Sequence, residues 1–267
     1  MHPLPRRWRY RCFLLAAAVF LAASLVPAPI PANSKHRATA PAASSRQTAR
    51  PLVAIIIDDM GYNLQLDRQF VQMGSRLSLS FLPRAPHARE LARQAHAAGH
   101  DILVHLPMEP KDKKWRLEPE TLLEADDPEQ IRKKVREMLA AIPWAAGADN
   151  HMGSLFSENA RNMRIVIATL KARGIYFVDS VTTPGSQGLA AAQQLRLPSA
   201  RRHLFLDNDR ETDAICRQLH QLAALAQRQG QAIGIGHPNQ AMLAALEQCG
   251  GKAMQPVELV GVSRLTR

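Results

Sequence analysis

The feature that most constrains the fold of this 267-residue chain is the segment Leu52–Gly61, which reads Leu-Val-Ala-Ile-Ile-Ile-Asp-Asp-Met-Gly. Its first six residues are apolar and largely β-branched, and they do not alternate with polar residues. Such a run is typical of a strand that is buried on both faces of a parallel sheet. The strand delivers two carboxylates, Asp58 and Asp59, to the end where open α/β sheets and α/β barrels carry their functional sites.

The two adjacent acids can be interpreted in two ways. Successive side chains of a strand point to opposite faces, so Asp58 and Asp59 are expected to have different roles in one site. Alternatively, one acid caps a helix and the other is simply solvated. The residues that end the other predicted strands favour the first interpretation.

Short apolar runs and amphipathic stretches alternate from Pro51 onward. Repeated strand–helix units predict a parallel sheet with right-handed crossovers. Residues 51–267 are therefore interpreted as one domain, an α/β fold that forms a distorted (β/α) barrel of about seven or eight units. An open, doubly wound sheet is the alternative, although the chain lacks a Gly-rich dinucleotide-binding motif. The predicted strands are Leu52–Ile57, Leu77–Leu82, Ile102–His105, Ala148–His151, Ile175–Val178, His203–Leu206, Ala232–Gly236 and Val257–Val262.

The amphipathic stretches carry helix start and stop signals. Asp127, followed by Pro128 and by Gln130, has the pattern of an N-terminal capping box. The stretch Pro107–Ala125 has no clear period and is interpreted as a long loop over the mouth of the barrel. The predicted helices are Leu64–Met73, Ala88–Ala98, Asp127–Ile142, Asn159–Arg173, Arg210–Gln229 and Asn239–Gln248.

The N-terminus has the composition of an export signal. Four arginines precede an uncharged apolar run of 15 residues, Cys12–Val26, and small residues follow that run. The run is short for a membrane span, so residues 1–28 are interpreted as a signal peptide, and no stable membrane span is expected after its cleavage. Residues 29–50 are rich in Pro, Ala and Ser and are predicted to be a linker. The protein is therefore expected to be exported, to the periplasm.

The formal net charge of +11 does not indicate a nucleic-acid-binding protein. Residues 1–50 contain eight Lys and Arg residues and no acid, which leaves a net charge of only +3 for the rest of the chain. That charge is too small for an electrostatic footprint on DNA, and aromatic and basic residues do not interleave. No nucleic-acid partner is expected.

Five predicted strands end in an acid or a histidine. These residues are the pair Asp58 and Asp59, then His105, His151, Asp179 and His237. The carboxyl ends of parallel strands meet at one end of a barrel, so a shared site explains this placement better than chance. One carboxylate and two imidazoles suit a catalytic divalent metal. Asp59, His105 and His151 are therefore candidate ligands of Zn²⁺ and, less specifically, of iron, cobalt or manganese.

Three residues of the predicted loops could contact a substrate. Glu109 follows His105 by four residues and Ser154 follows His151 by three, and each is interpreted either as a partner of the site or as a loop cap. Trp115 lies in the loop over the mouth, where it could stack on a sugar ring or anchor the packing of the loop. The other histidines of the body are expected to be structural; they are His87, His96, His100, His203 and His220.

Five motifs in this order resemble the divergent polysaccharide deacetylase family, in particular its YibQ-like branch. They are Asp58–Gly61 with the isoleucines before it, His105–Pro110, Asn150–Ser154, Val178–Ser180 and Gly236–Pro238. The family is related to NodB-type carbohydrate esterases, which have a distorted (β/α) barrel and use a bound metal to remove N- or O-acetyl groups from polysaccharides. The resemblance thus implies a barrel of polysaccharide deacetylase type, a metal and a carbohydrate substrate.

The resemblance also implies roles for the strand-end residues. Asp58 matches the catalytic base, Asp59 a metal ligand and His105 the first histidine of the family's His-x-x-x-His motif. Glu109 stands where the second histidine of that motif is expected, so His151 is the candidate replacement ligand.

The last histidine matches the catalytic acid of the family. His237 would protonate the leaving group, with Asp179 as the carboxylate that orients it. The arginine motif that supports the base in NodB-type enzymes is not evident in the sequence.

Together these observations predict a metal-dependent hydrolase that removes acetyl groups from an envelope or extracellular polysaccharide, with Glu109, Ser154 and Trp115 contacting the substrate. The loss of the second histidine favours an alternative, a non-catalytic envelope-associated protein that binds a glycan or a metal on the same barrel. A phosphoesterase would need more cationic or bridging ligands than the sequence offers. Cys216 and Cys249 could form a disulfide in an exported chain or remain as two buried thiols.

Overall fold

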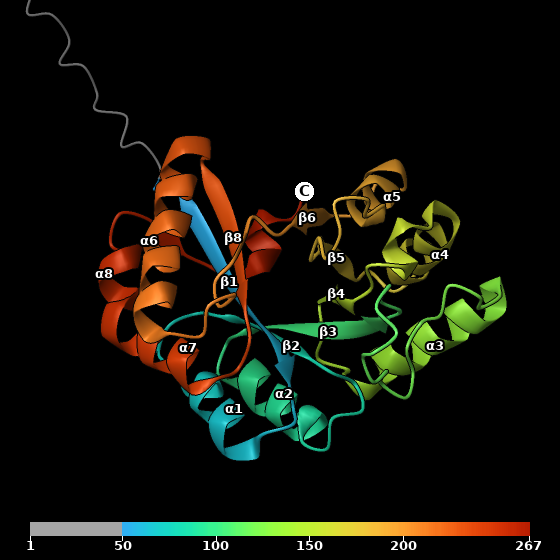
Figure 1. Ribbon diagram of the computed structural model, residues 1–267, viewed down its shortest axis with the longest axis horizontal. Coiled ribbons are helices and arrows are strands. Elements are labelled where there is room, and N and C mark those ends of the chain that lie inside the picture. Colours follow the sequence, from blue (N-terminus) through green and yellow to red (C-terminus); the bar gives the residue numbers. More distant parts are fainter. Residues whose placement is uncertain (1–49) are drawn as a thin grey trace, which may run out of the picture. The chain divides into compact units, whose positions relative to one another are not determined.

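The computed structural model describes residues 50–267, so the predicted signal peptide and nearly all of the predicted linker lie outside the described residues. Parallel strands form one sheet in the order β6-β5-β4-β3-β2-β1-β8-β7, with β9 beside β1 (Figure 1). The strands are β1 (Leu52–Met60), β2 (Ser78–Phe81), β3 (Asp101–Met108), β4 (Gly147–Met152), β5 (Tyr176–Asp179), β6 (Ser199–Arg201), β7 (Leu204–Phe205), β8 (Gln231–Gly236) and β9 (Glu258–Leu259).

The two strands at the ends of this order are consecutive in the chain. β6 pairs with β5 and β7 pairs with β8, and only Arg202 and His203 separate β6 from β7. The backbone N–H of Arg202 donates to the carbonyl of Asp179 at 2.9 Å, and that of His203 donates to the carbonyl of Ile233 at 2.8 Å. Residues 199–205 therefore cross from one edge of the curled sheet to the other, which confirms the distorted barrel predicted from the sequence.

Helices cover the outer face of the curled sheet (Figure 1). The predicted capping box is present at the start of α3, where the Asp127 carboxylate accepts the backbone N–H of Gln130 at 2.9 Å and Gln130 Oε1 accepts the backbone N–H of Asp127 at 2.7 Å. In the described residues, no helix combines the length and the apolar character that crossing a membrane requires. The helices are α1 (Leu64–Val71), α2 (Ala88–Ala97), α3 (Pro128–Ala141), α4 (Ala160–Lys171), α5 (Gly188–Gln194), α6 (Thr212–Gln229), α7 (Gln240–Ala245) and α8 (Gly251–Met254), with the shorter turns η1 (Phe156–Glu158), η2 (Leu246–Gly250) and η3 (Val262–Leu265).

Alternate residues of β1 belong to two separate hydrophobic clusters. Val53, Ile55 and Ile57 pack in the larger cluster with the apolar faces of the helices, whereas Ala54 and Ile56 pack in a smaller one with other strands. The smaller cluster fills the inside of the curl, because side chains of a strand alternate between its two faces. Both faces of β1 are therefore buried, as its unbroken apolar sequence predicts.

The C-terminal segment completes the inner cluster. Val260, Val262 and Leu265 are almost fully buried there, against residues such as Ile56 and Ile235 of the strands. The prediction of a strand over Val257–Val262 is therefore only partly correct, since β9 has two residues and the chain then turns into η3. The segment after β9 fills the inside of the barrel and has no neighbouring strand to pair with. Its backbone conformation is therefore set by the packing of its side chains.

Among the elements that the sequence did not predict are the helix α5 and the strand β6. The helix α5 reads Gly-Leu-Ala-Ala-Ala-Gln-Gln, and its small residues give little helical periodicity. The strand β6 reads Ser-Ala-Arg, which lacks β-branched or aromatic residues. Both elements form because neighbouring elements contact them, which no local pattern reveals.

The two cysteines of the domain form a disulfide. Cys216 on α6 is bonded to Cys249 on η2, with a Cα–Cα distance of 5.9 Å. The sequence left this pairing open against two buried thiols, because local patterns do not determine how far apart two helices lie.

Candidate metal centre

The strand β1 carries both of its acids into one cavity. The pairing of β1 with β2 shifts register between Ile57 and Met60, and Asp59 lies in the left-handed region with φ of +56°. Asp58 and Asp59 consequently both line the cavity. The expectation that they point to opposite faces is wrong, because the two-residue alternation of a strand fails at an irregularity that adds a residue to one strand.

Residues of three strands converge on one carboxylate oxygen. Asp59 Oδ1 lies 3.2 Å from His105 Nε2 and 2.8 Å from His151 Nδ1. The two imidazole rings meet edge to face, with their centroids 5.0 Å apart. The strands β1, β3 and β4 thus bring together the three side chains that were predicted as metal ligands, with one candidate donor atom of each within 4.8 Å of the others; β3 runs on to Met108, so His105 lies inside that strand rather than at its end.

The chemistry of this cluster fits a divalent cation. Asp59 Oδ1 is buried and has no hydrogen-bond partner in the described structure, although both ring nitrogens are close. Asp58, Asp59 and Asp149 surround the two imidazoles, so the buried site carries more acids than bases. Burial alone would raise the pKa of the Asp59 carboxyl, but its contacts with His105 and His151 hold that pKa well below its usual value. Carboxylate oxygen and imidazole nitrogen are the donors that Zn²⁺ takes in catalytic sites.

A buried carboxylate that the sequence analysis missed orients His105. Asp149 Oδ1 lies 2.9 Å from His105 Nδ1 and accepts the hydroxyl of Ser80 at 2.5 Å. With Nδ1 held by Asp149, the other ring nitrogen, Nε2, faces Asp59. Burial by itself would lower the pKa of His105, but the charges of Asp58 and Asp149 raise it well above its ordinary value.

Asp58 is fully enclosed beside the same histidine. Its Oδ2 lies 3.8 Å from His105 Nε2, and its Oδ1 is buried without a hydrogen-bond partner in the described structure. Burial, together with repulsion from Asp149, raises the pKa of Asp58 well above its usual value. A carboxylate in such surroundings has a high affinity for a proton, which a general base requires.

Arg202 provides a positive charge near this acid. Its Nε donates to the carbonyl of Ser180 at 2.7 Å and its terminal nitrogen donates to that of Val181 at 2.8 Å. The guanidinium lies 3.6 Å from the centroid of the Phe205 ring, and burial lowers the pKa of Arg202 against the opposing charges of Asp179 and then Asp58. No sequence motif marks this arginine, since it lies in the two-residue link between β6 and β7.

Asp207 rather than Asp179 holds His237. His237 Nδ1 lies 3.1 Å from Asp207 Oδ1, and Asp207 Oδ2 accepts the backbone N–H of His237 and the Asn239 amide, both at 2.9 Å. The predicted pairing with Asp179 is wrong, because His237 directly follows β8, which lies between β1 and β7, and Asp207 comes shortly after β7. Asp179 instead fastens the chain that follows β5, by accepting hydrogen bonds from the backbone of Val181, the hydroxyl of Ser186 and the backbone of Leu189.

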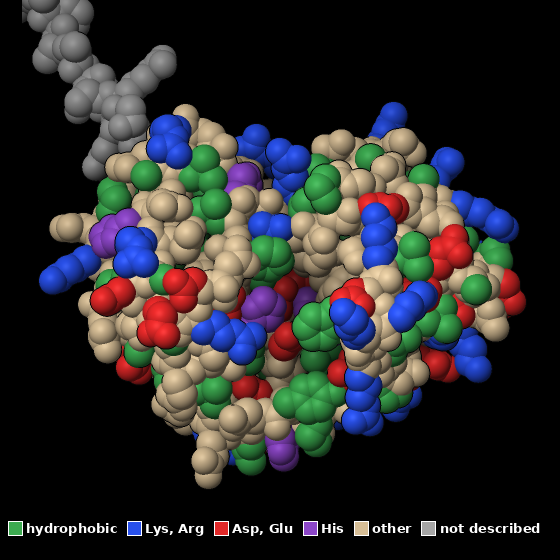
Figure 2. Space-filling model, in the orientation of Figure 1, with side chains coloured by type: hydrophobic (Ala, Val, Ile, Leu, Met, Phe, Trp, Pro, Cys, Tyr) green, Lys and Arg blue, Asp and Glu red, His purple; other side chains and the backbone are tan. Residues whose placement is uncertain are grey.

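The strand ends open into a cavity of about 380 Å³. Figure 2 shows histidine and acidic side chains gathered in a central hollow of this face. Trp115, which is 59% exposed, and Ser154 line the cavity, where the sequence analysis expected substrate contacts. Glu109 does not line the cavity: its carboxylate contacts the Lys113 ammonium and accepts the backbone N–H of Glu124 at 2.8 Å. Glu109 therefore fastens the loop, which corrects its assignment as a substrate contact.

The parallel sheet curled into a distorted barrel has the fold of the polysaccharide deacetylases. Within that class, the chain belongs to the divergent polysaccharide deacetylase family, whose model matches residues 55–266. The chain is 38% identical over 213 residues to the uncharacterized protein YibQ of Escherichia coli strain K12. The matched residues make up 80% of this chain and 66% of that protein. It is 32% identical over 219 residues to an uncharacterized protein of Haemophilus influenzae, and the matched residues make up 82% of this chain and 78% of that protein.

Solved structures show the same fold. An uncharacterized protein of Agrobacterium tumefaciens C58 superimposes with a TM-score of 0.77 at 24% identity, over 82% of this chain and 90% of that one. The peptidoglycan N-acetylglucosamine deacetylase Bc1960 superimposes with a TM-score of 0.51 at 12% identity, over 80% of this chain and 87% of that one. The chitin deacetylase of Colletotrichum lindemuthianum gives 0.50 at 14% identity, over 81% and 88% of the two chains.

Proposed function

We propose that the protein is an exported, metal-dependent hydrolase that removes acetyl groups from an envelope or extracellular polysaccharide. One observation carries the proposal: Asp59, His105 and His151 meet at the rim of the cavity that Asp58 and His237 also line. Membership of the divergent polysaccharide deacetylase family supports the choice of substrate. The Cys216–Cys249 disulfide supports export, since disulfides persist in oxidising compartments.

Asp59, His105 and His151 would hold the metal, which we take to be Zn²⁺. When bound, such an ion lowers the pKa of water and polarises an acyl carbonyl. Asp58 would receive the proton of the attacking water; its buried carboxyl beside the same cluster, with an oxygen that has no hydrogen-bond partner in the described structure, supports this role.

His237 would protonate the departing amine or hydroxyl. Asp207 holds its Nδ1, so the other ring nitrogen is the one that can transfer a proton. A carboxylate at this position also stabilises the imidazolium form from which the proton is given. This pair takes the place of the expected pair of His237 and Asp179.

The mouth of the cavity suits a sugar ring. Trp115 presents an exposed indole there, and Phe205 also lines the cavity, with its ring centroid 6.2 Å from that of His237. The exposed indole of Trp115 is the aromatic face that could pack against the apolar face of a pyranose ring, since Arg202 covers the Phe205 ring. Ser154 Oγ, which accepts the backbone N–H of Lys111 at 3.0 Å, adds a polar group to the same wall.

The decisive experiment measures acetate release from acetylated peptidoglycan and acetylated chitooligosaccharides, with and without a chelator. We expect turnover that chelation removes and Zn²⁺ restores. Asp58→Asn is expected to lower turnover by about 100-fold or more while the metal content stays at the wild-type level. Turnover that survives complete removal of the metal would refute the mechanism. Glycan binding without acetate release would instead identify a non-catalytic binding protein.

A further inference from the structure

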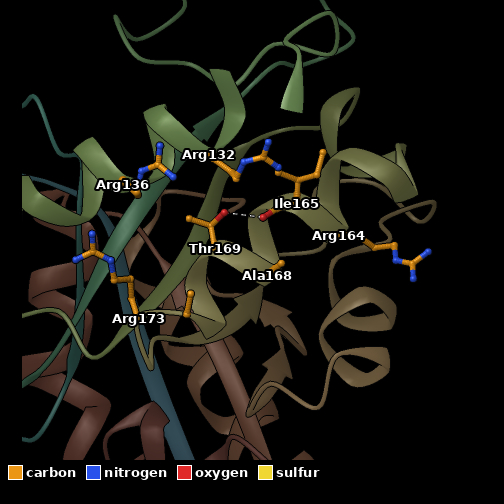
Figure 3. Close-up of a pocket in the computed structure, with 8 residues that line it drawn as sticks. Arg132, Arg136, Arg164, Ile165, Ala168, Thr169 and Arg173 are labelled. Atoms are coloured by element: carbon orange, nitrogen blue, oxygen red, sulfur yellow. Dashed lines mark hydrogen bonds between the residues drawn. The ribbon is translucent and has the colours of Figure 1, made fainter. Parts of the chain in front are cut away.

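A second concave surface lies between α3 and α4 and shares no residue with the candidate metal centre. This groove has a volume of about 310 Å³. In Figure 3, Arg132 and Arg136 on α3 lie on one side of Thr169 and Arg173 lies on another, while the guanidinium of Arg164 extends away from them. The floor between these arginines is formed by the small or aliphatic side chains of Ile165, Ala168 and Ala172.

The groove lies where the positive charge of the domain is concentrated. Residues 128–141 and 160–173, which comprise the two helices and the first residues after α4, contain eight Lys and Arg residues against two Glu, a net charge of +6. Residues 51–267 as a whole carry only +3, so the remainder of the domain is net negative. An acidic partner would therefore be attracted to this pair of helices in preference to the rest of the domain.

The arginines of the groove keep free hydrogen-bond donors. Glu129 accepts from Arg132 at 2.9 Å and from Arg136 at 2.8 Å. One exposed carboxylate cannot saturate two guanidinium groups, each of which has five N–H donors. Within residues 50–267, Arg164 and Arg173 form no ion pair. Further carboxylates can thus bind without displacing an existing partner.

We propose that this groove is a docking site for an acidic amphipathic helix of a partner protein. Arg132 and Arg136 are one helical turn apart on α3. Carboxylates one turn apart on the partner would pair with these two arginines, a further carboxylate would pair with Arg173, and its small apolar residues would cover the aliphatic floor. The proposal is independent of the hydrolase activity, since the two surfaces have no residue in common.

Other anionic partners fit the groove less well. A glycan would lack an aromatic face to stack on, because the residues that line the groove include no aromatic side chain. A membrane would meet a hollow surface, and the large exposed hydrophobic residues of the described chain, Tyr62, Trp115 and Leu117, lie outside this groove.

The test uses fluorescence anisotropy with a labelled helical peptide of about 18 residues, which carries Glu at i and i+4 on one face and Ala and Leu on the other. We expect the full chain to bind this peptide and to bind a Glu→Gln version of it at least about tenfold more weakly. Arg136→Glu/Arg173→Glu should weaken binding at least about tenfold. The matched control, Arg76→Glu/Arg217→Glu, has the same change in net charge at exposed sites elsewhere and should weaken binding less than about twofold.

Circular dichroism checks that each variant is folded. If Arg136→Glu/Arg173→Glu is not folded, Arg136→Gln/Arg173→Gln is used in its place, and a smaller loss of peptide binding is expected for it. Equal loss in the groove and control variants would overturn the proposal, because binding would then follow net charge alone. Heparin or phosphatidylglycerol vesicles serve as competing probes. If either binds more tightly than the peptide and depends on the same two arginines, the groove is a glycan or lipid site and the proposal is wrong.

Discussion

At the scale of single residues, the site depends on backbone conformations that residues other than glycine rarely adopt. Asp59, Met152 and Val181 have positive φ angles of 56°, 53° and 48°, and they lie at or next to the ends of β1, β4 and β5. For a β-branched residue such as Val181 this conformation is an outlier. Each such residue costs about 1–3 kcal/mol, and surrounding contacts must hold it in place. One such contact is the hydroxyl of Thr182, which donates to the carbonyl of Met152 at 2.7 Å.

Two buried aspartates are expected to separate metal binding from proton transfer. Asp149→Asn should weaken Zn²⁺ binding by about 10–100-fold, because Asp149 orients His105 and is not one of the three proposed ligands. Asp207→Asn should leave Zn²⁺ affinity unchanged and lower acetate release, because Asp207 contacts His237 and Asn239 and none of the three proposed metal ligands. Competition with a chromogenic chelator measures the affinity. If both variants lose metal to the same extent, the assigned roles are incorrect.

The buried His100 is expected to make stability depend on pH. Its Nε2 donates to the carbonyl of Val71 at 3.0 Å and its Nδ1 accepts the backbone N–H of Leu77 at 3.2 Å, so the folded protein needs the neutral ring. Burial lowers the pKa of His100 below its ordinary value of 6.5. The unfolded chain then binds more protons below pH 6.5. Stability is therefore complete above that pH and falls as the pH decreases toward the folded pKa, by up to about 1.4 kcal/mol per pH unit.

Urea denaturation at pH 5 and pH 8 measures this difference. His100→Gln removes the titration while keeping a donor and an acceptor, so the loss of stability at pH 5 relative to pH 8 should shrink. His96→Gln, the same change at an exposed histidine of α2, should leave the difference as it is in the wild type. An unchanged pH dependence in the His100 variant would show that another group is responsible.

At the scale of elements, the outer helices are held by different means along the chain. The start of α3 is held locally, by the reciprocal capping of Asp127 and Gln130. The last helical turns are held covalently, because the disulfide joins α6 to η2 across a sequence separation of 33 residues. Since η2 lies between α7 and α8, the bond restrains the whole segment that leads to the C-terminal plug of the barrel.

The loss of this disulfide should destabilise the domain without disturbing the metal centre. For a separation of 33 residues, the chain-entropy model gives about 3–4 kcal/mol for Cys216→Ser/Cys249→Ser. Denaturation midpoints with and without reductant should converge in the double variant. Zn²⁺ affinity below the transition should match that of the wild type, and a large loss of affinity would show that the segment also supports the site.

At the scale of the whole molecule, the C-terminal residues and the link between β6 and β7 together complete the barrel. The backbone of Ser199 on β6 exchanges two hydrogen bonds with that of Arg267, at 3.0 and 3.2 Å. Val262 and Leu265, a few residues earlier, fill the inside of the curl. The strands that carry the site thus rest on a core closed by the last residues of the chain.

Shortening a side chain of this plug should therefore affect the entire domain. Leu265→Ala is expected to lower the free energy of unfolding by about 2–5 kcal/mol, because Leu265 is 1% exposed and leaves a cavity inside the barrel. Leu117→Ala, at a leucine that is 40% exposed, should change it by less than about 0.5 kcal/mol. Calorimetry of the unfolding transition measures the free energy of unfolding of both variants. If both substitutions change it by the same small amount, the C-terminal plug does not support the domain.

The sequence determined the features that short-range patterns encode. The apolar run before Asp58 predicted a strand buried on both faces, and the order of acids and histidines at strand ends predicted the convergence of Asp59, His105 and His151. Asp149 was also within reach, because it lies two residues before His151 on β4 and so shares its face. Local patterns suffice here because burial and strand direction constrain where each side chain can lie.

The tertiary structure alone decided which distant residues pair. Strand order placed Asp207 rather than Asp179 beside His237, and the link between β6 and β7 placed Arg202 near Asp58. A local irregularity in the pairing of β1 with β2 lets the adjacent acids Asp58 and Asp59 face the same cavity, whereas in a regular strand they would face opposite sides. These outcomes depend on contacts between elements far apart in the chain, and no local pattern contains the distances between such elements.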